Sequence, residues 1–109
     1  MRILLLTVAT LALASVSPAS QAKEVTQSGR SICTWGSGIA AGAQESKLDG
    51  ITLYGARKKL QGRKFNQPWM RMTAMGITEQ TYKSTSRLKP AAIKQTYYEQ
   101  CIKHELARR

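Results

Sequence analysis

The stretch SICTWGSGIAAGA, residues 31–43, decides the fold of this chain. Its larger apolar residues recur at spacings of three and four, which places them on one face of a helix. These residues are Ile32, Trp35, Ile39 and Ala43. Ser31 can accept a hydrogen bond from the first turn as an N-cap. We therefore expect a first helix from Ser31 to about Leu48.

The same stretch is rich in small residues. Gly36, Gly38 and Gly42 each weaken a helix by about 1 kcal/mol relative to alanine. Gly36, Ala40 and Ala43 form a strip through which a neighbouring helix can approach closely. We therefore expect close packing against another helix here, and a flexible, glycine-broken segment is the alternative.

Three further helices are expected outward from this segment. Gly50 suits the left-handed residue that commonly follows a helix, so it ends the first one. Thr52 can cap a short second helix that ends at Leu60. Prolines at first-turn positions predict a third helix over residues 68–83 and a last helix that begins at Pro90.

The buried faces of the last two helices follow from the same periodicity. On the third helix we expect to find buried Trp69, Met72, Met75 and Tyr82. On the last helix one stripe consists of Ile93, Tyr97 and Cys101, and the adjacent one of Tyr98, Ile102 and Leu106. Because no segment alternates as a strand does, we expect an all-α fold, a small four-helix domain.

The two cysteines, Cys33 and Cys101, lie on the first and last of these helices. In an oxidising compartment such a pair is expected to form a disulfide, and closing so long a loop would contribute about 4 kcal/mol. The alternatives are two free thiols or a metal pair. His104 makes a Cys-x-x-His pattern with Cys101, but a structural zinc needs four ligands and the chain offers few others. We therefore expect the disulfide, with no metal site and no cofactor.

The N-terminal segment has the three parts of a secretory signal peptide. Arg2 precedes the apolar run ILLLTVATLALA, which is shorter than the roughly 20 residues that span a membrane. Small residues then offer cleavage after Ala22, or alternatively after Ala19. We expect a signal peptide over residues 1–22, a flexible lead-in over 23–30 and the helical domain over 31–109. The mature protein would be periplasmic or secreted, without a membrane span.

The mature chain is strongly basic. Cleavage removes Arg2 alone among the charged residues, which leaves 16 Lys and Arg against 6 Asp and Glu, a net charge of +10. Such a charge favours anionic partners, here lipopolysaccharide, phospholipid headgroups, acidic polymers or an acidic protein. The densest basic cluster, followed by the aromatic residues Phe65 and Trp69, is the expected anion-binding site. It consists of Arg57, Lys58, Lys59, Arg63 and Lys64.

Two other readings of this cluster remain. A basic segment is also compatible with a solvated helix end that binds nothing. Cations beside aromatic residues can bind single-stranded nucleic acid, but export separates the domain from it, so we expect no such partner.

No catalytic residues are expected. Cys101 and His104 could form a nucleophilic pair, but nothing in the sequence supplies an orienting residue or an oxyanion site. The six acidic residues form no obvious pair of the kind that hydrolyses glycans. The sequence therefore favours a protein that is not an enzyme, with a small hydrolase as the last alternative.

The layout resembles small exported helical bacterial proteins of unknown function. The features that carry the resemblance are Cys33 opening an Ala/Gly-rich helix, Gly50 before the next helix, Tyr82, and the closing segment YYEQC that ends at Cys101. The expected export and the basic middle segment make a non-enzymatic binding protein of the bacterial envelope, which recognises an anionic surface, the first hypothesis. Some proteins that neutralise toxins delivered by type VI secretion are similar in size and disulfide use, so a periplasmic immunity protein is the second hypothesis.

Overall fold

The computed structural model describes residues 24–108, and the expected signal peptide lies outside the described residues. The described part contains four helices, α2 (Gln27–Leu48), α3 (Leu53–Gln61), α4 (Pro68–Lys83) and α5 (Pro90–Ala107), and no strand. The predicted all-α fold of four helices is confirmed.

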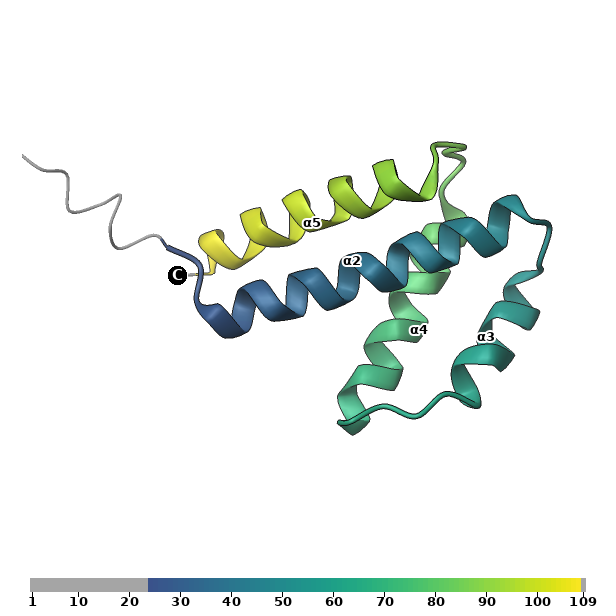
Figure 1. The fold of residues 1–109 in the computed structure, drawn as a ribbon, viewed down its shortest axis with the longest axis horizontal. Helices are drawn as coiled ribbons and strands as arrows, with labels where there is room; N and C mark the ends of the chain where they lie inside the picture. Colours follow the sequence, from purple (N-terminus) through teal and green to yellow (C-terminus); the bar gives the residue numbers. More distant parts are fainter. Residues whose placement is uncertain (1–23, 109) are drawn as a thin grey trace, which may run out of the picture.

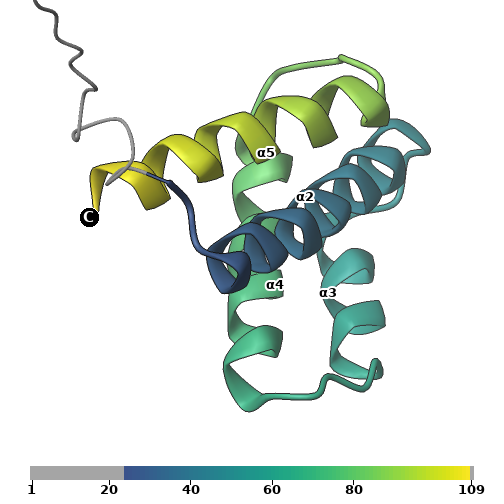
Figure 2. The same ribbon diagram turned by 60° about the vertical axis from the view of Figure 1, so that its left-hand side comes forward.

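Helix α2 is the centre of the fold, because α4 and α5 both pack against it and not against each other. Figure 1 shows α2 and α5 side by side and antiparallel, while α4 crosses α2 steeply. Helix α3 lies antiparallel to α4, and Figure 2 shows this second pair projecting away from α5. The domain is therefore two crossed helix pairs rather than one bundle of parallel axes.

The start of α2 corrects one prediction. Thr26, and not Ser31, is the N-cap, and its side chain accepts a hydrogen bond from the Gly29 amide at 3.0 Å. The helix begins at Gln27, so residues 27–30 belong to it and not to a flexible lead-in. Gly29 is buried, and a Cβ added there would lie 3.0 Å from Glu105 of α5, so a tertiary contact supports this first turn.

The predicted disulfide is present. Cys33 of α2 is bonded to Cys101 of α5, with the two Cα atoms 5.5 Å apart. Because the helices are antiparallel, the bond joins the beginning of the first helix to the end of the last one. Neither cysteine is then available as a nucleophile or a metal ligand.

The close approach predicted for the small-residue strip of α2 is also confirmed. A Cβ added at Gly36 would lie only 2.9 Å from the Tyr97 ring, so glycine is what lets this ring of α5 rest on the α2 backbone. Ala40 and Ala43 are buried as well. Gly50 adopts φ 86°, the left-handed conformation expected of it after the end of α2.

The buried face predicted for α4 is wrong at two positions, whereas Met75 and Tyr82 are partly buried and Met75 packs against the core. Trp69 and Met72 are 44% and 78% exposed, whereas Ala74, Ile77 and Thr78 are buried. Helix α4 crosses α2 at a steep angle, and such a crossing favours small residues at the contact. The core is a cluster of small and medium side chains. It consists of Ile39, Ala40, Leu60, Ala74 and Ile77, with partly buried neighbours such as Trp35 and Tyr97.

Candidate functional site

The expected anion-binding cluster lies on α3 and the connection to α4, but its first member, Arg57, is paired with an acidic residue of α4. The Arg57 guanidinium forms a salt bridge with Glu79 of α4, and its Nε donates to Oε2 at 3.1 Å. Both side chains are about two-fifths exposed, at 39% and 37%. Arg57 is therefore neutralised by a neighbour and joins α3 to α4, so it is not a free cation of the site.

The other four cations are exposed, and a fifth joins them from α4. Arg63 and Arg71 both lie against the Phe65 ring, with their guanidinium carbons 5.5 and 5.4 Å from its centroid. Arg71 also donates to the backbone oxygen of Arg63 at 2.7 Å, which holds the two guanidinium groups near one aromatic ring. We call the exposed set the basic surface; it consists of Lys58, Lys59, Arg63, Lys64 and Arg71.

Glu45 of α2 lines the same hollow as Lys59 and Arg63, but the segment that carries the basic surface contains no acidic residue of its own. Residues 50–78 contain six Lys and Arg but no Asp or Glu, and Glu79, the next acid along the chain, is the partner of Arg57. At neutral pH the connection between α3 and α4, together with its flanks, therefore carries an excess of positive charge. A surface with an excess of positive charge raises the local concentration of anionic partners and steers their approach.

A cluster of aromatic and apolar side chains adjoins these arginines. Trp35 of α2 lies edge-on to Phe65 and to Trp69, with ring centroids 6.4 and 5.8 Å apart. Trp69 is exposed, as are Met72 one turn further along α4 and Ile32 one turn before Trp35. We call this set the apolar patch; it consists of Ile32, Trp35, Phe65, Trp69 and Met72.

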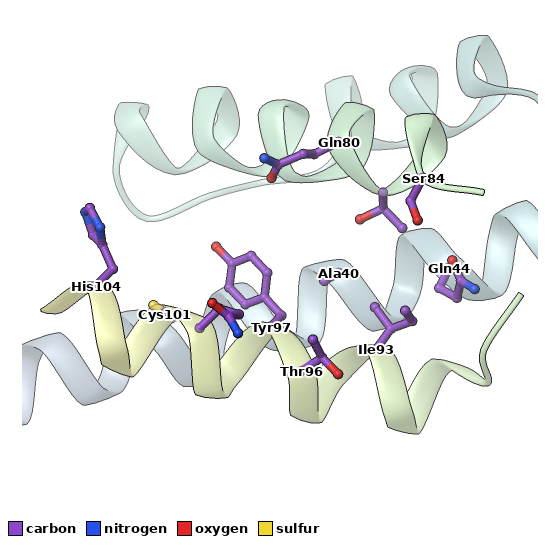
Figure 3. Close-up of a pocket in the computed structure, with 11 residues that line it drawn as sticks. Ala40, Gln44, Gln80, Ser84, Ile93, Thr96, Tyr97, Cys101 and His104 are labelled. Atoms are coloured by element: carbon purple, nitrogen blue, oxygen red, sulfur yellow. The ribbon is translucent and has the colours of Figure 1, made fainter. Parts of the chain in front are cut away.

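A cavity of about 670 Å³ lies in the groove between α4 and α5, against α2 (Figure 3). Tyr97 and His104 project into it from α5, and they are faced by Gln80 of α4 and by Ser84, the residue that follows α4. No carboxylate lines the groove, and burial raises the pKa of the Tyr97 hydroxyl, so this tyrosine stays neutral at physiological pH.

At one end of this groove, Gln44 is fully buried and ties α2 to the loop before α5. Its Nε2 donates to the backbone oxygens of Ser86 and Leu88 at 3.1 and 2.7 Å. These two acceptors fix the orientation of the amide, and Oε1 has no hydrogen-bond partner among residues 24–108. One turn later, the Lys47 ammonium donates to three backbone oxygens of the same region, those of Thr81, Ser84 and Ser86.

The structure does not assemble the other sequence patterns into sites. Cys101 is bonded to Cys33, so the Cys-x-x-His pattern provides neither a thiolate nor a thiol ligand beside His104. Among residues 24–108, no three His, Cys, Asp or Glu side chains are grouped so that they could hold a metal ion. No helix in this described part is long and apolar enough to cross a bilayer.

Comparison with known proteins gives no further assignment: no protein-family model, no curated protein and no solved structure matches this chain.

Proposed function

We propose that this protein is an exported, non-enzymatic binding protein of the bacterial envelope that recognises an anionic surface. The observation that carries the proposal is the basic surface, five exposed cations in a part of the chain that contains no acidic residue. The disulfide is consistent with an oxidising compartment outside the cytoplasm. In a bacterial envelope the abundant anionic surfaces are phospholipid headgroups and lipopolysaccharide, which share phosphate as the recognised group.

The arrangement of the arginines supports phosphate as that group. A guanidinium presents several N–H donors in a planar fork that matches the oxygens of phosphate, and it forms stronger hydrogen bonds with an anion than with a neutral acceptor. Arg63 and Arg71 lie against the same ring of Phe65, so part of the cost of ordering them is already met before a ligand binds. Two positioned guanidinium groups favour recognition of an anionic headgroup over nonspecific electrostatic association.

A vesicle-retention experiment tests the proposal. The mature chain, starting after residue 22, is mixed with phosphatidylcholine vesicles containing phosphatidylglycerol, with vesicles containing lipopolysaccharide, and with phosphatidylcholine vesicles alone. We expect retention on the two anionic surfaces, falling steeply between low and high salt because exposed charges are screened within about 10 Å at 0.1 M salt. Retention on neutral vesicles that equals retention on anionic ones contradicts the proposal.

Two charge-matched variants locate the site. The quadruple variant Lys58→Gln, Lys59→Gln, Arg63→Gln, Lys64→Gln removes four cations of the basic surface. The control replaces four exposed lysines elsewhere by glutamine. They lie at the end of α4, before α5 and on α5, and are Lys83, Lys89, Lys94 and Lys103. Since a cation near an anionic leaflet contributes about 1 kcal/mol, the loss of four should weaken the binding of the first variant roughly 1,000-fold. Equal losses in both variants would mean that only net charge matters and that the basic surface is not the site.

A further inference from the structure

The apolar patch has a composition that charge recognition alone does not explain. Trp69 and Met72 are 44% and 78% exposed on α4, and Ile32 is 40% exposed on α2. Single exposed apolar residues are common, but adjoining ones beside a charged surface mark places where a protein meets another apolar medium. Here the patch is contiguous through Trp35, which contacts both Trp69 and Phe65.

We infer that the anionic partner is the surface of a lipid bilayer, into which Trp69 and Met72 insert while Arg63 and Arg71 contact the headgroup phosphates. This inference rests on the proposed function and names its ligand. An indole ring has an apolar body and one N–H donor, which suits the boundary between headgroups and acyl chains. Phe65 joins the two halves of the surface, because it contacts Trp35 of the patch and both arginines.

The position of the patch in the fold fits such a contact. Phe65 lies in the connection between α3 and α4, and Trp69 lies in the first turn of α4. In Figures 1 and 2 this connection is the end of the α3–α4 pair that is farthest from α5. A flat bilayer can therefore approach it without first meeting α5, which carries the acidic residues Glu99 and Glu105.

The same observations disfavour three other occupants. A single-stranded nucleic acid needs aromatic faces on which successive bases stack, whereas Met72 and Ile32 offer alkyl surface suited to acyl chains. A second copy of this chain would bring two basic surfaces together with no acidic residue between positions 50 and 78 to compensate them. An acidic protein would satisfy the arginines, but it would need an apolar counterpart for the patch, whereas a bilayer supplies both the charge and the apolar layer.

Tryptophan fluorescence tests the insertion directly. Trp35→Phe leaves Trp69 as the single tryptophan of the mature chain and keeps an aromatic ring at the partly buried position. With anionic vesicles we expect the emission of Trp69 to shift to the blue and to be quenched by phospholipids brominated on the acyl chain. Salt-sensitive retention without shift or quenching would overturn the insertion and leave the proposed function standing. No retention on anionic vesicles would contradict both the insertion and the proposed function. A blue shift with single-stranded DNA but none with vesicles would assign the surface to nucleic acid.

A second pair of variants measures the contribution of the patch. Met72→Gln removes exposed alkyl surface without touching a charge, and Leu88→Gln, at a side chain 53% exposed in the loop before α5, is the matched control. Both side chains are exposed, so both variants should unfold at the temperature of the parent. We expect Met72→Gln to lower vesicle affinity by about tenfold and Leu88→Gln to leave it unchanged. Equal affinities for the two variants would contradict insertion at Met72.

Discussion

Breaking the bond between Cys33 and Cys101 should remove a large part of the stability of this domain. The bond closes a loop with a sequence separation of 68, for which the chain-entropy relation gives about 4 kcal/mol. A domain of this size has a free energy of unfolding of about 5–10 kcal/mol. Helix α5 should depend on the disulfide most, since none of its residues is buried and it packs only on α2. Loss of the bond should therefore release α5 before the other helices.

Urea denaturation of the oxidised and the reduced wild-type protein measures this effect without changing any other atom. The free energy of unfolding of a small domain falls by about 1 kcal/mol for each molar of urea. A loss of about 4 kcal/mol of stability therefore lowers the unfolding midpoint by roughly 3–4 M. The double variant Cys33→Ala, Cys101→Ala should behave like the reduced protein, with a small additional loss because Cys33 is fully buried. Hydrogen exchange locates the change: amides of α5 should lose protection first. A fall of less than about 1 M, or α5 amides as well protected as those of α4, would refute the reasoning.

Two further substitutions test how α2 holds its neighbours. Gly36→Val should destabilise the domain by about 1–3 kcal/mol in thermal unfolding, because its Cβ would already lie 2.9 Å from the Tyr97 ring; Gly38→Val, with nothing within 4 Å, is the control, and equal effects would contradict the contact. Lys47→Met should cost about 1–2 kcal/mol, because three backbone oxygens lose their charged donor. Lys83→Met, at an exposed lysine, should cost nothing measurable.

The helix boundaries with strong local signals could be predicted from the sequence. Thr52 caps α3 through a hydrogen bond from the Gly55 amide at 3.0 Å, and Pro68 and Pro90 open α4 and α5. In each case the signal is a property of one residue and its nearest neighbours along the chain. The start of α2 carries the same local signal, because Thr26 caps it through the Gly29 amide, but the polar segment before Ser31 shows no apolar periodicity and its first turn is supported by a neighbour from α5. That contact joins residues far apart in the sequence, so neighbouring residues do not predict it.

Which cations form the basic surface could be determined only from the tertiary structure, for the same reason. A run of cations is visible in the sequence, but which of them is free depends on partners distant along the chain. Arg57 and Glu79 are separated by 22 positions, so their pairing follows from the packing of α3 against α4. Arg71 stands apart from the run and joins it only because the connection folds back and brings Phe65 against it. The sequence therefore predicts where the charge lies and not which side chains present it.

The wrong prediction for α4 is itself informative about function. Trp69 and Met72 were expected in the core because large apolar residues at helical spacing usually lie there. The structure instead buries Ala74 and Thr78 at the crossing with α2 and leaves the two large residues exposed. Local rules tend to fail where a residue serves something other than folding. An exposed tryptophan and methionine beside two arginines contribute little to this core, and at the bilayer interface that we propose all four side chains would gain contacts.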